Sequence, residues 1–503
     1  MSDPIDTNEA LSPDVGSSEH QTLDSIPPVR PGVLVQMVRP VPVYGLVVFR
    51  IAFGLSVAWF AVKFLGSRAL AHDYIDPPFH LTYYGFGWVR PWPGDGMYFH
   101  FMILAGSALG VALGFFYRVA SVLMFLAFTQ VFLSERALYN NHYYLISLLS
   151  FLICFMPLHR AFSLDAFRGT ISPAKTIPAW TLWLLRFQLG IVYFYGGIAK
   201  LNADWLQGQP MRMWLAAETD FPLVGHFFAE DWMVRIFVWG GILIDLLAVP
   251  LLMYRSTRRW MYIVLLLFHL MNSQLFHIGV FPWLMMAATT VFFDPQWPRR
   301  LMWIPGTVRS SQETASRSRA LSPAALCLLA MYCSVQIALP LKHFFIPGNA
   351  SWTECGHQFA WRMMLRQKQV GIRFYGRDKE TGREGVIDIR PFLTGRQATA
   401  ISRSPDLMVQ FAHWLSDELK KMGQGDAEIR ATCLTSLNGR RPQLFFDPQI
   451  DLADEPRRLG LYPWVNPLTE PLRDDAWDVP LSQWESHPEI AAQIAQVQTG
   501  ATP

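Results

Sequence analysis

The chain has 503 residues, of which 51% are hydrophobic and only 16% are charged, and its formal net charge is +3. Soluble domains carry about a quarter charged residues, so this composition indicates a polytopic membrane protein with a soluble part attached. The net charge is too small to indicate a nucleic-acid partner. The five cysteines show no CxxC motif and no other ligand spacing, and we expect no metal site.

The N-terminal 40 residues are polar and rich in Ser, Pro and Asp. They lack the basic region and short apolar core of a signal peptide, so we expect residues 1–40 to form a disordered cytoplasmic tail.

A transmembrane helical domain is predicted over residues 41–346. About 20 apolar residues cross a bilayer as a helix, and stretches of roughly this length recur. They cover residues 43–65, 97–116, 118–136, 142–158, 177–200, 232–253, 261–276, 278–293 and 320–343. We therefore predict about nine spans, of which 142–158 and those within 261–293 are short or ambiguous.

Basic residues predict the orientation of these spans, because cytoplasmic loops are rich in Lys and Arg. Three such loops occur at residues 160–175, 255–259 and 299–319. If they are cytoplasmic, nine spans place the N-terminus in the cytoplasm and the C-terminal part outside. The same parity places the loops near 137–141, 201–231 and 270–277 outside.

The composition after residue 346 is that of a soluble domain, and we expect a small β-rich extracytoplasmic domain over residues 347–475 with a C-terminal tail over 476–503. QVGIRFYG and VIDIR flank DKETGREG and predict a hairpin. EIRATCLTS and PQLFFDP flank the Asn438–Gly439 turn signal and predict a second hairpin. Between them a single amphipathic helix is expected, with Ser404 as N-cap, Pro405 at its first position and Gly423 as its stop.

Lys200 is an unusual residue, because it closes a long apolar run within YFYGGIAKLNADW. One helix face carries, at 100° per residue, Tyr193, Gly196, Gly197 and Lys200. The two glycines clear space for a closely packed helix or for a flat ligand. Lys200 is then either a base in an apolar pocket or a lysine whose amine extends to the membrane boundary.

Two further polar groups fall at the predicted outer ends of their spans. The first is Asn140–His142 in YNNHYY, and the second contains His269 and Asn272 in FHLMNSQLFHIGVF. Helix capping and interhelical hydrogen bonds explain them as well as a ligand site does. Their common depth with Lys200 favours one site.

Charged residues also occur deeper in the spans. Arg186 and Asp245 lie at similar predicted depths in antiparallel spans, and Arg50 has a comparable depth. Because a lone charge is costly there, we predict a structural ion pair between Arg186 and Asp245, with Arg50 as a further candidate member.

These segments resemble the vitamin K-dependent γ-glutamyl carboxylases, and the chain is similar to a bacterial homologue with an HTTM-type membrane domain. In the membrane part the resemblance rests on YNNHYYLISLLSFL, FSLDAFRG, LRFQLGIVYFYGGIAKLNADWLQG, GGILIDLLA, FHLMNSQLFHIGVF and DPQWPRRL. In the soluble part it rests on WTECGHQFAWRMML, YGRDKETGREG and LFFDPQIDL. It implies a multi-pass protein of the bacterial inner membrane.

The resemblance also implies a reaction. Vitamin K hydroquinone, as phylloquinol or menaquinol, is oxidised by O₂ to the epoxide, and the energy released drives carboxylation of a peptide glutamate by CO₂ without a metal. The family's catalytic base falls on Lys200. The candidate cofactor-binding residues are Asn141, His142, Tyr193, Gly196, Gly197, His269, Met271, Asn272 and Ser273. Arg362 and Arg366 are candidates for binding the acidic peptide.

Two alternatives remain open from the sequence. A quinol epoxidase or oxygenase would keep the quinone chemistry without carboxylation. A non-enzymatic membrane transporter or scaffold would use the polar residues of the spans differently.

Overall fold

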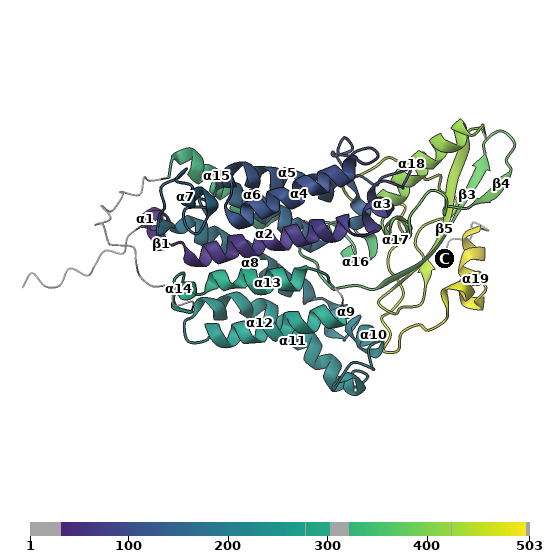
Figure 1. Cartoon of the computed structure of the whole chain (residues 1–503). Helices are drawn as coiled ribbons and strands as arrows, with labels where there is room; N and C mark the ends of the chain where they lie inside the picture. The colour runs from purple at the N-terminus through teal and green to yellow at the C-terminus, as the bar shows by residue number, and fades with distance from the viewer. Residues whose placement is uncertain (1–31, 277, 302–320, 424, 499–503) are drawn as a thin grey trace, which may run out of the picture.

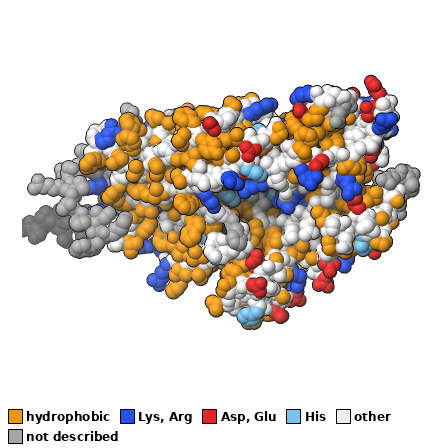
Figure 2. Space-filling view, turned by 45° about the vertical axis from the view of Figure 1, so that its right-hand side comes forward, with side chains coloured by type: hydrophobic (Ala, Val, Ile, Leu, Met, Phe, Trp, Pro, Cys, Tyr) orange, Lys and Arg blue, Asp and Glu red, His pale blue; other side chains and the backbone are white. Residues whose placement is uncertain are grey.

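The computed structural model describes residues 32–276, 278–301, 321–423 and 425–498. Most of the expected N-terminal tail therefore lies outside the described residues. The molecule is elongated, with a helical bundle at one end and a smaller part built on a sheet at the other (Figure 1). Hydrophobic side chains cover much of the bundle surface in the face that Figure 2 shows, as a lipid environment requires.

Each of the nine predicted apolar stretches forms a helix. The helices are α2 (Tyr44–Leu65), α4 (Gly96–Leu113), α5 (Tyr117–Ser134), α6 (Asn141–Phe155), α8 (Ala179–Lys200), α11 (Asp231–Met253), α12 (Arg258–Leu275), α13 (Phe281–Ala288) and α15 (Pro323–Leu341). Among the described residues, six helices have the length and hydropathy to cross a membrane, namely α2, α4, α5, α8, α11 and the α15 segment. The protein is thus a multi-pass membrane protein, and nine spans are not confirmed, because α6 and α13 are short and α12 carries several polar residues.

Short elements connect these helices. They are α1 (Val33–Val38), β1 (Pro40–Pro42), α3 (Ala69–Tyr74), η1 (Arg136–Leu138), α7 (Leu164–Phe167), β2 (Thr176–Pro178), α9 (Ala203–Leu206), α10 (Met211–Ala216), η2 (Gly225–Phe227), η3 (Thr289–Phe292), α14 (Trp297–Leu301) and η4 (Lys342–Phe344). Helices α7 and α14, beside two of the basic loops, lie at the end farthest from the sheet (Figure 1). Helices α9 and α10 lie at the sheet end, as the parity of the spans predicts.

The predicted ion pair between Arg186 and Asp245 does not form. Arg186 instead donates to the carbonyl oxygens of Val291 at 2.9 Å and Phe293 at 3.2 Å. The register of α8 against α11 explains the difference, because Gly190 faces Val249. Arg186 is consequently level with the end of α11, whereas the Asp245 carboxylate lies beside Gly196, about 15 Å further along α8.

Arg50, the further candidate member, also forms no ion pair with Asp245, which pairs with Lys200. Its guanidinium is fully buried and donates to the carbonyl oxygens of Leu158, Ala161 and Phe162 at 2.9, 3.2 and 2.5 Å. These carbonyls belong to the chain that follows α6. Arg50 therefore satisfies backbone acceptors that have no partner within a helix.

The soluble part contains a four-stranded antiparallel sheet in the order β4-β3-β5-β6. Strands β3 (Lys368–Asp378) and β4 (Glu384–Ile387) form the first predicted hairpin, and β5 (Ala427–Leu437) and β6 (Gln443–Leu444) form the second. Asn438 and Gly439 both adopt positive φ at 54° and 77°, as a tight two-residue turn needs. The long strands β3 and β5 pair with each other and join the hairpins.

Helices contribute more to this part than the sequence predicted. The expected helix is α18 (Pro405–Lys421), with Ser404 at its N-cap, although the Ser404 side chain makes no capping bond. It is preceded by α17 (Gly395–Arg403), which the single-helix expectation missed. The remaining helices are α16 (Ala350–Thr353), η5 (Leu481–Gln483) and α19 (Pro488–Gln498). Trp484 and Ile490 are buried, so the chain around these two residues packs on the domain, where the sequence predicted a tail.

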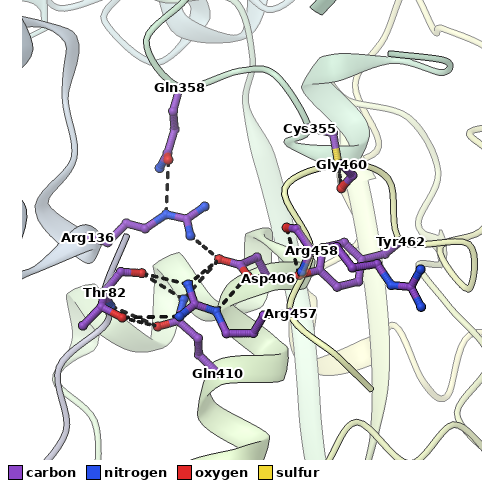
Figure 3. A network of polar contacts seen from close by, with 10 residues as sticks. All are labelled: Thr82, Arg136, Cys355, Gln358, Asp406, Gln410, Arg457, Arg458, Gly460 and Tyr462. Carbon is purple, nitrogen blue, oxygen red and sulfur yellow. Dashed lines mark hydrogen bonds and ion pairs between the residues drawn. The ribbon is translucent and has the colours of Figure 1, made fainter. Parts of the chain in front are cut away.

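A polar network centred on Asp406 joins the two parts of the molecule (Figure 3). The Asp406 carboxylate accepts from Arg136 of η1, from Arg457 at 3.1 Å and from the Tyr462 hydroxyl at 3.0 Å. Arg457 also donates to the carbonyl of Thr82 at 3.1 Å. One carboxylate on α18 therefore holds two guanidinium groups at the junction.

Replacing Asp406 with Asn is expected to lower the free energy of unfolding by about 3 kcal/mol, because two largely buried guanidinium groups lose their counter-charge. Thermal unfolding in lipid nanodiscs measures the change. The matched control is Asp388→Asn, whose pair with Arg390 is exposed and should contribute almost nothing. Equal melting temperatures for the two variants would contradict the assignment.

The contacts of Asp406 with Arg136 and Arg457 also predict that the stability of the protein depends on pH. Burial would raise the pKa of Asp406, but Arg136 and Arg457 hold that pKa below its usual value. Such a carboxylate stabilises the fold above its unfolded pKa of about 3.9, and the contribution is lost as the pH falls through the folded value. The gap in melting temperature between wild type and Asp406→Asn should therefore be constant near neutral pH and close below about pH 4. A gap that persists in acid would contradict the prediction.

Candidate functional site

A cavity of about 580 Å³ lies where α8, α11, α12 and α13 meet the chain that enters the soluble part. This volume is in the usual range for small-molecule sites. Its walls are largely apolar, with contributions from Val192, Ile244, Phe268, Phe281 and Met285. Ionisable side chains line this apolar space at separate points.

The cavity also reaches the outer surface of the bundle between α11 and α12. Ile236 of α11 and Leu267 and Met271 of α12 line it, although 56%, 61% and 39% of these residues are exposed. In a membrane this surface faces lipid. A long apolar chain attached to a ligand could leave the cavity here.

Lys200 is buried at the cavity wall and pairs with Asp245. Its Nζ donates to Asp245 Oδ2 at 2.5 Å and to the carbonyl oxygen of Gly196 at 3.3 Å. The side chain therefore turns back along α8 by one turn and does not extend toward the membrane boundary. Both members of the pair also line the cavity.

The turn after Lys200 holds this side chain in place. Asn202 caps α9 by accepting from the Trp205 backbone N–H at 3.1 Å. The Trp205 indole is 1% exposed, donates to the Val238 carbonyl of α11 at 3.1 Å and lies 5.5 Å from the Lys200 amine. The aromatic ring of Trp205 thus lies against the amine.

Gly196 and Gly197 make room for a helix. A Cβ at Gly196 would lie 3.2 Å from Asp245 Oδ2, and one at Gly197 would lie 2.6 Å from Leu246 Cδ2. The glycines do not line the cavity. They let α11 approach closely enough for Asp245 to reach Lys200.

A second polar point is formed by Tyr193 and His269. The Tyr193 hydroxyl lies 2.9 Å from His269 Nε2, and both side chains are buried and line the cavity. They come from α8 and α12, so the hydrogen bond fixes the distance between these helices. Each group can donate or accept, which suits a ligand oxygen.

The start of α6 forms part of the cavity wall. Asn140 caps α6 by accepting from the Tyr143 N–H at 2.8 Å, as the capping alternative predicted. Asn141 accepts from the Tyr139 hydroxyl at 3.1 Å, and the His142 ring lies 5.3 Å from that of Phe281. Asn141 and His142 both line the cavity.

The segment between α16 and β3 closes the cavity on the soluble side with basic residues. Arg362 is 8% exposed and donates to Ser351 Oγ at 3.0 Å, but its Nε has no partner. Burial lowers the pKa of Arg362 to about 10, so it stays cationic. His357 Nδ1 also lacks a partner, and burial together with Arg366 and Arg362 holds the pKa of His357 well below its usual value.

Arg366 differs from Arg362, because its charge is already neutralised. It forms two hydrogen bonds of 2.7 Å with the carboxylate of Glu354. Both arginines line the cavity, but only Arg362 presents a guanidinium without a carboxylate partner.

The structure brings together most of the residues that the sequence singled out. Those that line the cavity are Lys200, Asn141, His142, Tyr193, His269, Met271, Asn272, Arg362 and Arg366. Gly196, Gly197 and Ser273 do not line it, and the Ser273 hydroxyl donates to the Leu270 carbonyl at 2.7 Å. Within the described ranges, no three His, Cys, Asp or Glu side chains lie close enough to hold a metal ion.

Sequence reasoning missed three contributors. Asp245 was assigned to another partner, and Trp205 and His357 were not singled out. The GGILIDLLA motif carried a signal for Asp245, because an acid inside an apolar run needs a cation. His357 had no local signal, since the chain around it makes no regular element between α16 and β3.

Comparison with known families agrees with this architecture. The HTTM domain matches residues 38–297, just over half of the chain, and so defines a multi-pass membrane protein of that class. The lumenal domain of vitamin K-dependent gamma-carboxylase matches residues 321–471. The chain belongs to the vitamin K-dependent gamma-carboxylase family. No solved structure matches it.

The close approach of α8 and α11 predicts a specific sensitivity. Gly197→Ala should destabilise the protein by about 1–3 kcal/mol, because the new methyl group overlaps Leu246. Gly190→Ala on the same helix is the matched control, since its Cβ would meet Val249 at an ordinary 3.6 Å. Thermal unfolding should show Gly190→Ala unchanged or slightly stabilised. A Gly197→Ala variant as stable as the control would contradict the packing described.

Proposed function

We propose that the protein oxidises vitamin K hydroquinone with O₂ to the epoxide and carboxylates peptide glutamate, with Lys200 as the base that ionises the hydroquinone. The observation that carries the proposal is the Lys200–Asp245 pair at the wall of an apolar cavity of about 580 Å³. The family gives the coarser function, a vitamin K-dependent carboxylase-like enzyme.

The cavity fits a lipid-soluble quinol. Its apolar walls suit a flat two-ring compound, and the polar points at Lys200 and at Tyr193–His269 suit its two oxygens. The opening between α11 and α12 provides a path for the isoprenoid tail. When bound, the hydroquinone would supply, through its oxidation by O₂, the free energy that removal of a proton from a glutamate γ-carbon needs.

Lys200 requires a free lone pair to accept a proton, and Asp245 provides the means. A proton that moves from Lys200 Nζ to Asp245 Oδ2, across 2.5 Å, leaves a neutral amine facing the cavity. The buried site favours this neutral pair more than water does, because both charges are removed together. Asp245 is thus a positioning residue that also holds the proton.

Water is excluded from this proton transfer by the surrounding side chains. Trp205 covers the amine, and Tyr193 and His269 hydrogen-bond to each other across the wall. A dry site prevents quenching of a strong base.

Arg362 is the better of the two arginine candidates for the glutamate side chain. Its guanidinium lacks a carboxylate partner, whereas Arg366 is paired with Glu354. A peptide would reach it from the soluble part, which we place outside the bacterial inner membrane.

Replacing Lys200 with Ala is expected to abolish quinol-dependent O₂ uptake and epoxide formation, because no other amine lines the cavity among the described residues. Asp245→Asn should lower the epoxide-forming rate by about 10²-fold and leave quinone binding intact, since the amide cannot accept the proton. Lys63→Ala, an exposed lysine on α2, is the control. The assay supplies hydroquinone, bicarbonate and a glutamate peptide, and quantifies epoxide and carboxylated peptide separately by mass spectrometry.

Each outcome of that assay is informative. Epoxide formation that survives in Lys200→Ala would contradict the assigned base. Epoxide without any carboxylated peptide in the wild type would leave the quinol epoxidase alternative in place of the carboxylase.

A further inference from the structure

A small pocket of about 180 Å³ lies at the junction of the bundle and the soluble part. It shares no lining residue with the cavity that contains Lys200. Its walls come from the loop at residues 83–86, from the end of α15 with η4, and from residues 353–359 and 458–460. We call it the interfacial pocket, because it lies where the bundle ends.

Lys342 is the unpaired cation of this pocket. It follows α15 directly in η4, and its ammonium lies 5.3 Å from the centre of the Phe359 ring. The ammonium makes no hydrogen bond or ion pair with any residue that the structure describes. An aromatic face supports a cation but leaves its hydrogen-bond donors free for an anion.

The two acids that line the pocket do not compensate this charge. Glu354 is engaged by Arg366 in two hydrogen bonds of 2.7 Å. Asp406 is shared between Arg136 and Arg457. Both carboxylates are therefore committed to other bases, and the pocket retains an excess of positive charge that attracts anions.

Arg458 supplies a second available cation at the edge of the pocket. The residue lines the pocket and is exposed, and its guanidinium is not paired with any described residue. In Figure 3 this side chain points away from Asp406, which already binds two other guanidinium groups. A long exposed side chain can turn toward an anion at the mouth of the pocket.

Exposed aromatic residues surround the mouth of the pocket. Tyr84, Phe86 and Trp88 are exposed in the loop on one side, and Trp88 is 79% exposed. Phe344 and Phe345 are exposed directly after the lysine, and Phe345 is 83% exposed. Aromatic side chains concentrate at the boundary between a bilayer and water. The pocket is therefore at the level of lipid headgroups.

The helix that leads to the pocket faces lipid. Only 11% of the membrane-spanning window of α15 is buried, the lowest share among the six candidate spans of the described residues. Leu328, Met331 and Val335 are exposed on it, and Lys342 follows Val335 by seven residues. This spacing places all four on one helical face. An acyl chain on that face would bring its headgroup to the lysine.

We propose that the interfacial pocket binds the phosphate headgroup of an anionic membrane lipid, with Lys342 as its main ligand and Arg458 at its edge. A lysine binds phosphate as a compact positive charge. The pocket is too small for acyl chains, which would lie outside it along α15. A zwitterionic lipid brings its own cation, so it gains less from a positive pocket. The proposal does not depend on the proposed reaction.

The test measures lipid binding to the delipidated full chain in neutral detergent. Phosphatidylglycerol is titrated, and native mass spectrometry quantifies the complex with one lipid. Lys342→Gln should weaken binding about fivefold, and adding Arg458→Gln should weaken it about fivefold again. Phosphatidylcholine should bind more weakly than phosphatidylglycerol and should not respond to either change. Equal binding of phosphatidylglycerol to wild type and double variant would overturn the proposal.

The matched control is Lys63→Gln combined with Arg68→Gln. These residues are also one lysine and one arginine, are exposed near the end of α2, and do not line the pocket. The control removes the same charge and should bind phosphatidylglycerol like the wild type. Equal weakening in the two double variants would overturn the pocket, because it would show only a net-charge effect.

A soluble phosphate compound is the other source of the same chemistry. Glycerol 3-phosphate should displace phosphatidylglycerol only at a large excess, because it lacks the contact of the acyl chain with α15. Displacement at an equal concentration would overturn the assignment to a lipid.

A second measurement uses the unaltered chain and so carries the test if a variant does not fold. Phosphatidylglycerol with a photoreactive headgroup is crosslinked to the protein in nanodiscs, and the labelled peptides are mapped by mass spectrometry. Label at residues 83–86, 342–345 or 458–460, reduced by unlabelled phosphatidylglycerol, would support the pocket. Label confined to other parts of the chain would overturn it.

Discussion

The buried pair between Lys200 and Asp245 is the interaction on which the arrangement of the bundle core depends. It joins the last residue of α8 to the middle of α11 and accounts for two charges that an apolar interior would otherwise exclude. Gly196 and Gly197 are small because the helices must approach for this pair to form. The Trp205 ring covers it, and the apolar cavity begins at its open side.

Two cavities of the molecule differ in the chemistry of the side chains that line them. The apolar one opens between α11 and α12, where side chains of the bundle surface take part in its wall. A second cavity, which Arg136, Arg396 and Arg403 line, lies between η1 and α17. Arg366 and Tyr139 line both cavities, so the two cavities adjoin. The Asp406 network connects α18 to η1 of the bundle and to Thr82.

Much of the fold could be predicted from the sequence, because apolar length and turn signals are local properties. All nine apolar stretches are helices, and both predicted hairpins form in the expected places. The missed helix α17 is short and polar, and its GRQATAISR sequence lacks the apolar repeat that identified α18. The predicted number of spans is not confirmed either, because α12 mixes polar residues into an apolar run.

The sequence predicted many of the residues that line the cavity, but it did not predict which of them contact each other. Lys200, His142, Tyr193 and His269 do meet at one cavity. The predicted partner of Asp245, Arg186, was wrong. That prediction places each residue by its distance from the end of its helix, and the two helices do not end in the same plane. A register of this kind depends on packing between distant segments, and the spacing of residues within one helix does not contain it. Gly197 carried the missing information, since its close contact with Leu246 fixes that register.

The opening between α11 and α12 has a consequence for how reactants meet. If the protein acts on a quinol, as proposed, that compound would enter the cavity from the bilayer, at a concentration set by its partition into lipid. On the same proposal, a water-soluble peptide would come from the side of the soluble part. The supply of the quinol would then depend on the lipid around α11 and α12, and the supply of the peptide would not.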